Sequence, residues 1–452
     1  MTVLSRLIAV SVTIAASAFT AGAAVVSGDT LRLSRNECVE IALQDNPTIR
    51  IADLEVKRMD YSKREVLANL FPNIDFQGSF QRTIKLQTIS MNMGGHTQQF
   101  KMGTDNNWNF GFSASMPLVN AALWKSIQIS DTQILASLEE ARASRLDLVN
   151  NINKAYYALM LAVASRDVIR QNYEIAKMNA DMYAGQFDNG TASEYDVLRS
   201  SVQVSNIEPE LLQADISVRQ CSLQLKMLMG IDNEVAVMPS VALADMKSEM
   251  YGYSLGAGRS LDRNTSLRTL DIQTETLRKT LTMRKFAWIP TLAASYNLNW
   301  NAMSSGNALK NQIFNPYSNV ALVLQVPIFN GLGRSSAVKQ AKLQVQEMEF
   351  QRENLVNNLN MQVDLALDNI NKQVRQIESS EQGVRQAAKA YEIMQKSFEI
   401  GAATYLNLRD SELANTQAQL AYFQAIYNYL VSTSELDTLL GREDALGIPT
   451  SR

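Results

Sequence analysis

Several residue types are scarce in this 452-residue chain, and each shortage excludes a class of protein. The two cysteines, Cys38 and Cys221, are too few for a disulfide scaffold, so we expect two buried free thiols, with a Cys38–Cys221 bridge as the alternative. One histidine, His96, argues against a histidine-based metal site or a catalytic triad. The formal net charge of −3 gives the chain no positive electrostatic potential that would attract nucleic acid.

No catalytic constellation emerges from the remaining residues. His96 follows Gly94-Gly95 in the connection between two expected strands, where we expect an exposed loop. Carboxylate pairs such as Glu139-Glu140 are expected on solvated helix faces, and the glycines follow no phosphate-binding spacing. We therefore expect no enzyme, no cofactor, no metal site and no nucleic-acid partner.

The first 23 residues have the pattern of a cleavable export signal. Arg6 precedes an apolar stretch at 7–19 that is too short to span a bilayer, and Ala21-Gly22-Ala23 is a small-x-small cleavage site. A buried N-terminal helix is the alternative. No apolar run of 18 residues follows, so any membrane that the chain spans must be crossed by strands.

The chain is an internal duplication, and this predicts its architecture. Asn46 precedes Pro72 by 26 residues, and Asn264 precedes Pro290 by the same 26. Three more matches follow in the same order: Met116-Pro117 with Val326-Pro327, Phe187 to Gly190 with Phe398 to Gly401, and Leu228-Met229-Gly230 with Leu439-Leu440-Gly441. We expect a first repeat over 24–235, a linker at 236–262, a second repeat over 263–441 and a tail at 442–452.

Two strands are expected in each repeat, at 74–86 and 108–116 and at 291–300 and 318–326. Apolar and polar residues alternate in all four, which indicates sheets with one apolar and one mostly polar face. A half-buried soluble sheet would show the same alternation. The lengths also suit tilted transmembrane strands, and Trp108, Trp300 and Tyr317 near the strand ends suit an interfacial girdle.

A helix precedes each strand pair, at about 36–70 and 263–287, and a very long one follows, at about 120–186 and 335–399. A shorter helix then returns after a glycine turn, at about 193–229 and 404–440. Helical spacing of apolar residues supports each long helix. For the last helix we expect a buried stripe of Leu413, Leu420, Phe423, Tyr427 and Leu430.

Four strands per chain cannot close a membrane barrel, and lipid does not tolerate open sheet edges. Two chains would supply eight strands, whose barrel is filled by its own side chains, whereas three chains supply twelve and leave a channel. A conducting duct therefore favours three chains or more, and the expected fold class is mainly α with a membrane β-barrel, joined to a long α-helical coiled-coil cylinder that extends into the periplasm.

This plan resembles the TolC family of outer-membrane efflux proteins, the outer-membrane factors of tripartite pumps. The motifs that carry the resemblance are Glu37-Cys38-Val39-Glu40-Ile41-Ala42-Leu43 with Asn46-Pro47, Leu70-Phe71-Pro72, Met116-Pro117-Leu118, Asn189 to Leu198, and Pro327 to Gly331. The resemblance implies a homotrimer in outer-membrane lipid, whose four strands per chain form a trimeric 12-stranded β-barrel joined to a long periplasmic α-helical coiled-coil barrel. Such a trimer would conduct substrates passively to the exterior. Its implied partners are a periplasmic adaptor (membrane fusion protein) and an inner-membrane transporter.

The resemblance also implies that the two helix-to-helix turns form the periplasmic tip, where an adaptor docks. The docking residues would be Asn189, Gly190, Thr191, Ala192, Ser193, Gly401, Ala402, Ala403 and Thr404. A periplasmic constriction would involve Asp196, Arg199, Phe398, Asn407 and Asp410, with Asn407 where the family often has an acid. For Asp410, a solvated surface position or a salt bridge to Arg409 or Arg199 is the alternative.

Two other functions remain open at this point. The strands could form a small sheet domain in a soluble periplasmic adaptor or binding module, which would be recovered without detergent. Alternatively, the duct could carry proteins, as in type I secretion, because no residue selects a cargo of drugs, metals, peptides or proteins.

Overall fold

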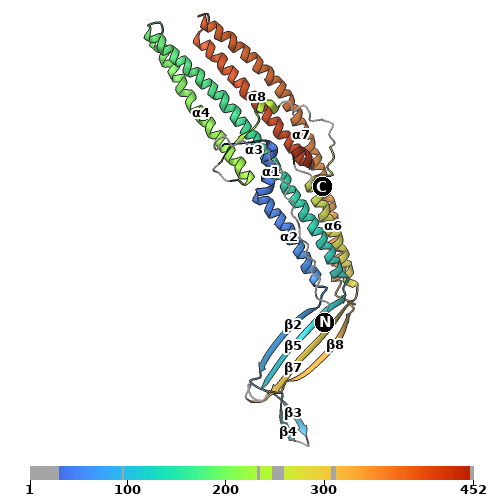
Figure 1. Ribbon diagram of the computed structural model, residues 1–452. Helices are drawn as coiled ribbons and strands as arrows, with labels where there is room; N and C mark the ends of the chain where they lie inside the picture. Colours follow the sequence, from blue (N-terminus) through green and yellow to red (C-terminus); the bar gives the residue numbers. More distant parts are fainter. Residues whose placement is uncertain (1–29, 94–95, 232–234, 247–258, 307–311, 448–452) are drawn as a thin grey trace, which may run out of the picture. The chain divides into compact units, whose positions relative to one another are not determined.

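The computed structural model describes residues 30–93, 96–231, 235–246, 259–306 and 312–447 (Figure 1). The expected signal at 1–23 lies outside these residues, as do parts of the linker and the tail. The described chain forms two compact units, built from residues of 1–44, 151–254 and 370–432, and of 45–150, 255–369 and 433–452. Among the described helices, none combines the length and apolar character needed to cross a membrane.

A four-stranded antiparallel sheet forms the strand part of the second unit. Its strands are β2 (Asn73–Arg82), β5 (Asn106–Val119), β7 (Thr291–Ser304) and β8 (Asn315–Gln325). They lie side by side in the order β2-β5-β7-β8, so each repeat supplies two neighbours and β5·β7 joins the repeats (Figure 1). β2 and β8 each pair on one side only within the described chain.

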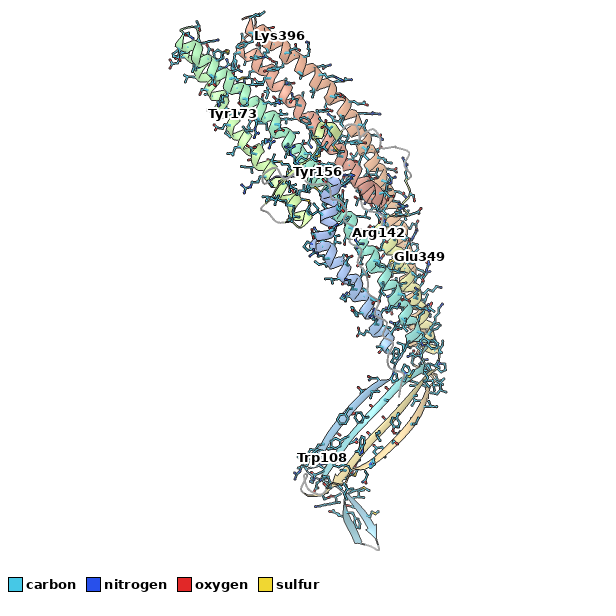
Figure 2. The ribbon with its side chains drawn as sticks, in the orientation of Figure 1. Trp108, Arg142, Tyr156, Tyr173, Glu349 and Lys396 are labelled. Atoms are coloured by element: carbon cyan, nitrogen blue, oxygen red, sulfur yellow. The ribbon has the colours of Figure 1, made fainter. Side chains whose placement is uncertain are left out.

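The strand register aligns the apolar alternation of all four strands on a single face. One row across the sheet is apolar: Ile74, Ala114, Tyr296 and Val320. The adjacent row is polar: Asp75, Ser113, Asn297 and Asn319. Aromatic rings reinforce the apolar face, because the rings of Phe80 and Trp108 lie 4.2 Å apart, with Trp108 labelled in Figure 2. The alternation thus yields one sheet with two distinct faces.

A second, two-stranded hairpin continues from the sheet, and the sequence pattern did not predict it. β3 (Gln87–Met93) pairs with β4 (His96–Met102) in antiparallel register. The expectation that His96 lies in a loop is wrong, since His96 is the first residue of β4 and the register partner of Met93. A glycine pair is typical of an open loop and of a tight hairpin turn alike, so the sequence does not distinguish the two.

The helix expected before the first strand pair is two helices, α1 (Arg35–Asp45) and α2 (Pro47–Ala68). They break at Asn46, whose extended backbone caps α2 through a 2.7 Å bond accepted from the Thr48 amide. The equivalent Asn264 caps α6 (Thr265–Lys285), where it accepts a 2.8 Å bond from the Leu267 amide, and η2 (Phe286–Trp288) follows. The duplicated asparagines therefore have the same structural task, satisfying amides at a helix start.

The long helices are α3 (Ala121–Asp188) and α7 (Gly333–Glu399), and the returning helices are α4 (Glu194–Met229) and α8 (Tyr405–Leu440). The expected stripe of α8 is wrong in part, because Leu413 is 49% exposed while Leu408, Ile426 and Tyr429 are buried. Apolar residues occur on several sides of α8, so spacing alone did not select the buried side.

Arg142 on α3 anchors the C-terminal end of the second unit. Its guanidinium bonds to the carboxylates of Glu139 and Glu443 and donates to the carbonyls of Arg263 and Gly441, at 3.0 and 3.1 Å. Glu443 opens α9 (Glu443–Leu446). One side chain, labelled in Figure 2, therefore connects α3, the segment before α6 and the end of α8.

In the first unit, a parallel strand pair, β1 (Thr30–Leu33) and β6 (Ala236–Pro239), lies against the helices near η1 (Leu243–Met246). The Tyr156 hydroxyl on α3 donates to the Leu33 carbonyl at 3.1 Å, and Ser222 on α4 donates to Val237 at 3.0 Å. Cys38 and Cys221 are both free, and burial raises the pKa of Cys38 to about 12. Cys38 is fully buried, whereas Cys221 is only partly so.

Candidate functional site at the two helix turns

The first turn, between α3 and α4, closes with a glycine in the left-handed region. Gly190 has φ +72, and the Thr191 amide behind it donates to the Gln186 carbonyl at 2.8 Å. The Asn189 amide side chain donates to Gly185 at 2.8 Å. These bonds satisfy carbonyls at the end of α3 that the helix itself leaves open.

Ser193 begins α4 with a reciprocal cap. The Asp196 amide donates to Ser193 Oγ at 3.2 Å, and Ser193 Oγ donates to Asp196 Oδ2 at 2.6 Å. The Asp196 carboxylate is thus hydrogen-bonded at the N-terminus of its own helix, where the positive end of the helix dipole also stabilises its negative charge. This position restricts how freely Asp196 can contribute charge to a constriction.

The second turn, between α7 and α8, repeats the first. Gly401 has φ +76, the Ala402 amide donates to Ser397 at 2.8 Å, and the Asn407 amide donates to Thr404 Oγ1 at 3.3 Å. Ala403 follows in the same turn, as Ala192 does in the first. The two turns are built alike because the duplicated glycines allow the positive φ that both require.

Tyr405, the first residue of α8, connects the two turn regions. Its ring contacts Tyr183 of α3 edge-on, with centroids 5.6 Å apart, and Phe398 of α7 at 6.2 Å. Burial raises the pKa values of Tyr183 and Tyr405. Edge-to-face rings contribute about 0.5–1.5 kcal/mol beyond the area they bury. Sequence reasoning identified Phe398 but missed both tyrosines.

Arg199 of α4 completes this cluster. Its guanidinium carbon lies 5.5 Å from the centre of the Tyr405 ring, within range of a cation–π interaction. The cluster of Tyr183, Arg199, Phe398 and Tyr405, here called the aromatic latch, therefore draws on α3, α4, α7 and α8. It joins two helix pairs that are separated by about 200 residues of sequence.

Asn407 and Asp410 lie on α8 outside the latch, and both are exposed. Among the described residues, Asp410 has neither an ion pair nor a hydrogen bond to its carboxylate, so the salt bridge to Arg409 or Arg199 is absent. Of the five expected constriction residues, the structure brings Arg199 and Phe398 together through Tyr405.

Glu412, two residues beyond Asp410 on α8, is a less exposed carboxylate. Burial raises the pKa of Glu412 to about 7, and only the nearby Arg409 opposes this. Tyr391 of α7 and Tyr405 face the same carboxylate, since Glu412 raises the pKa of each. A group that titrates near neutrality within a helix pair makes that pair sensitive to pH.

Within the described residues, no group of three or more histidine, cysteine or acidic side chains could hold a metal. The chain matches the outer membrane efflux protein family over residues 38–231 and 257–442. The chain belongs to this family. The two matched stretches are the two halves of the duplication, so the family match covers most of the described chain.

Individual relatives are distant but similar over most of their length. The outer membrane protein TolC of Vibrio cholerae is 21% identical over 73% of this chain and 76% of its own. The cation efflux system protein CusC of Escherichia coli is 20% identical, over 88% of this chain and 84% of its own length. The solved structure of the CmeC outer membrane channel of Campylobacter jejuni has a TM-score of 0.69. It is 17% identical in sequence, and the match covers 90% of this chain and 85% of that channel's chain.

The chain is therefore an outer-membrane protein of an efflux channel family and not an enzyme. The expected mainly α fold with an internal duplication is confirmed by the duplicated family match and by the shared fold of solved channels, whereas the homotrimer stays a prediction. Membership of an outer-membrane efflux protein family favours the outer-membrane prediction over the soluble periplasmic alternative.

Proposed function

We propose that three copies of this chain form the exit duct of a tripartite efflux system, conducting substrates passively from a periplasmic tip to the exterior. The single observation that carries the proposal is the two-faced sheet with one unpaired edge on each side. The apolar face would meet lipid and the polar face would line water. β5, β7 and β8 contain no charged residue, which suits strands that cross a bilayer.

The strand directions support closure between copies. β2 and β8 run in opposite directions, because each neighbour in the order β2-β5-β7-β8 is antiparallel. A β2 strand placed beside β8 of another copy therefore continues the antiparallel pattern. Three such junctions would give a 12-stranded barrel with no open edge.

Cysteine cross-linking tests this closure. Ser79→Cys on β2 is combined with a cysteine at one of Tyr317, Asn319, Ala321 or Val323 on β8, all on the polar face. Oxidation of the matching pair should yield a covalent trimer as the largest product. Ser79→Cys with Asn109→Cys, which are register partners within one chain, is the control and should yield only monomers. Dimers alone, or species larger than trimers, contradict the proposal.

Conduction is tested separately by inserting the purified protein into planar lipid bilayers. A stable current through the wild type is expected, and no current in any state would contradict the duct. The cargo stays open between small molecules and proteins, as in type I secretion, because the partner pump would select it.

If three copies form this duct, the two helix turns would lie at its periplasmic tip. The two turns, Asn189 to Ser193 and Gly401 to Thr404, would be the docking site of a periplasmic adaptor linked to an inner-membrane transporter. Asn407 and Asp410 are exposed and would face the constriction, while the aromatic latch would hold the two helix pairs in the closed arrangement.

A further inference from the structure

The two connections between helices and strands in the second repeat lie at one end of the large sheet. η2 leads from α6 into β7, and β8 leads through residues 326–332 into α7 (Figure 1). Thr291 at the start of β7 and Gln325 at the end of β8 are register partners. The end of α6 and the start of α7 therefore meet the sheet at the same level.

Large apolar side chains of these connections are exposed. Ile328 is 89% exposed, Phe329 77%, Leu332 69% and Trp288 46%. Leu332 also has a φ of 66°, the one positive value of a non-glycine residue in the described chain. Such strain persists only where the surroundings compensate for it, and burial against the described chain does not do so here. A bilayer surface would give these side chains the apolar surroundings that the chain itself does not supply.

Four exposed cations lie beside these apolar side chains, and they are here called the basic rim. Arg284 and Lys285 end α6, and Lys339 and Lys342 lie in the first three turns of α7. Among the described residues, none of the four forms an ion pair. The sequence contains no aspartate or glutamate from residue 276 to residue 346, so the rim has no acid of its own repeat nearby in sequence.

Two ion pairs fix the alignment of α6 against α7. Arg278 lies 3.0 Å from Glu349, and Arg352 lies 2.6 Å from Asp271, so the two helices run antiparallel. When this alignment is continued toward the sheet, the end of α6 comes level with residues 338–343 of α7. The four cations of the basic rim therefore lie at one level, next to the exposed apolar connections.

The helix dipole accounts for only part of the basic rim. Cations are favourable at the C-terminal end of a helix, which suits Arg284 and Lys285 at the end of α6. The N-terminal end of a helix favours acids instead, yet the first turn of α7 contains Arg334 and no acid. Local helix stability therefore does not explain the cations of α7.

The corresponding place in the first repeat is balanced in charge. Lys63 lies 2.7 Å from Asp131, and Arg64 lies 2.8 Å from Asp60. Glu65 is a further acid near the end of α2. The excess of positive charge at this end of the sheet is therefore specific to the second repeat.

We propose that the basic rim binds the headgroups of anionic phospholipids, such as phosphatidylglycerol, at the periplasmic surface of the membrane. Lipid phosphates would accept hydrogen bonds from the guanidinium and the three ammonium groups, while Trp288, Phe329 and Leu332 contact the upper acyl chains. Charge complementarity selects an anionic lipid over a zwitterionic one. The inference rests on the proposed duct, because it requires the apolar face of the sheet to lie in the bilayer.

The test follows the fluorescence of Trp288 in lipid vesicles. The variant W108F/W124F/W300F keeps Trp288 as the only tryptophan of the full-length protein. This protein is reconstituted into vesicles of equal parts phosphatidylcholine and phosphatidylglycerol, in which one lipid or the other carries bromine on its acyl chains. Bromine quenches a tryptophan that it contacts. Because the two lipids are equally abundant, unequal quenching reports which lipid is enriched near Trp288.

We expect brominated phosphatidylglycerol to quench more strongly, corresponding to an enrichment of about three- to tenfold near Trp288. Adding R284Q/K285Q/K339Q/K342Q should bring the enrichment close to one. The matched control is K177Q/R219Q/K372Q/R375Q, which removes four exposed cations of the first unit and should leave the enrichment unchanged. Salt at about 1 M, where the Debye length is about 3 Å, should weaken the enrichment without any change at the rim.

The possible failures separate this proposal from the duct. Equal quenching by both lipids, an enrichment that survives R284Q/K285Q/K339Q/K342Q, or an equal loss in the control variant would overturn lipid selection by the rim and leave the duct standing. No quenching by either lipid would overturn both, because Trp288 would then lie away from the bilayer.

Discussion

Gly441 and Gly401 both have positive φ, yet their surroundings differ completely. A Cβ on Gly441 would lie 2.1 Å from the Arg263 carbonyl oxygen, whereas a Cβ on Gly401 would meet nothing within 4 Å. The free energy of unfolding lost on substitution by alanine should therefore report backbone strain alone at Gly401, and backbone strain plus a steric clash at Gly441.

We expect Gly401→Ala to lower the free energy of unfolding by about 1–2 kcal/mol, the cost of a left-handed non-glycine residue. Gly441→Ala should cost about 3–5 kcal/mol, because a backbone carbonyl cannot move away cheaply. Thermal unfolding followed by circular dichroism measures both. Equal costs would show that the Gly441 contact relaxes.

Glu412 predicts a pH dependence whose sign follows from its raised pKa. The folded value of about 7 lies above the ordinary value of 4.5, so the folded state holds more protons between these limits. Stability should therefore fall as pH rises from about 4.5 to 7, and the loss is complete above that. After allowance for partial exposure we expect about 1–2 kcal/mol.

Glu412→Gln should remove this slope between pH 5 and 8 and make the protein more stable than the wild type at pH 8. Glu392→Gln is the control, because salt bridges to Lys396 and Lys389 lower the pKa of Glu392 to about 2, outside this window. Unfolding curves at pH 5 and 8 measure the slopes. A wild type whose stability is flat across this range would refute the role of Glu412.

At the scale of elements, the aromatic latch connects α8 to α3 and α4 next to the two helix turns. Under the proposed duct, Tyr405→Ala removes three contacts of one ring and should raise the conductance of the closed channel in planar bilayers. Tyr405→Phe keeps the ring and should conduct like the wild type. Equal conductance of the alanine and phenylalanine variants would contradict a latch.

Arg142 has the corresponding task at the other end of α8. Arg142→Ala removes the cation that Glu139 and Glu443 share and frees two carbonyls, while Glu139 keeps Arg268 at 3.7 Å. We therefore expect a loss at the lower end of the range of about 3–5 kcal/mol that broken buried pairs cost. Limited proteolysis should then cut the C-terminal segment first, while Arg145→Ala, which removes a more exposed ion pair to Asp53, should not expose it.

At the scale of the whole molecule, the two faces of the sheet must meet different surroundings. Val320 is 74% exposed and lies on the apolar face, and its neighbour Asn319 lies on the polar face. Val320→Arg should cost about 2–4 kcal/mol if that face meets the bilayer midplane. Asn319→Arg should cost little.

The measurement is the amount of heat-resistant oligomer recovered from outer membranes in detergent. We expect Val320→Arg to lower it severalfold and Asn319→Arg to leave it near the wild type. The reverse order, or two equal losses, would mean that lipid does not cover the Ile74–Val320 face.

Much of this fold could be predicted from the sequence because it is periodic and duplicated. Alternation identified the sheet faces, since strand geometry turns every second residue to the same side. The hairpin β3–β4 was not predicted, because a glycine pair such as Gly94-Gly95 is as typical of an open loop as of a hairpin turn. The break at Asn46-Pro47 was also missed, although both residues favour a helix start.

The sequence by itself determined local features: the turns at Gly190 and Gly401, the four strands of the large sheet, and the long and returning helices. These depend on backbone preferences and on contacts a few residues apart. Only the tertiary structure decided that Tyr405 meets Tyr183 and Arg199, and that Met93 stands opposite His96. Such pairs depend on the register of strands and on the rotation of helices about their axes. The spacing of apolar residues predicts which face of an element is buried, but it does not predict which residue of another element that face contacts.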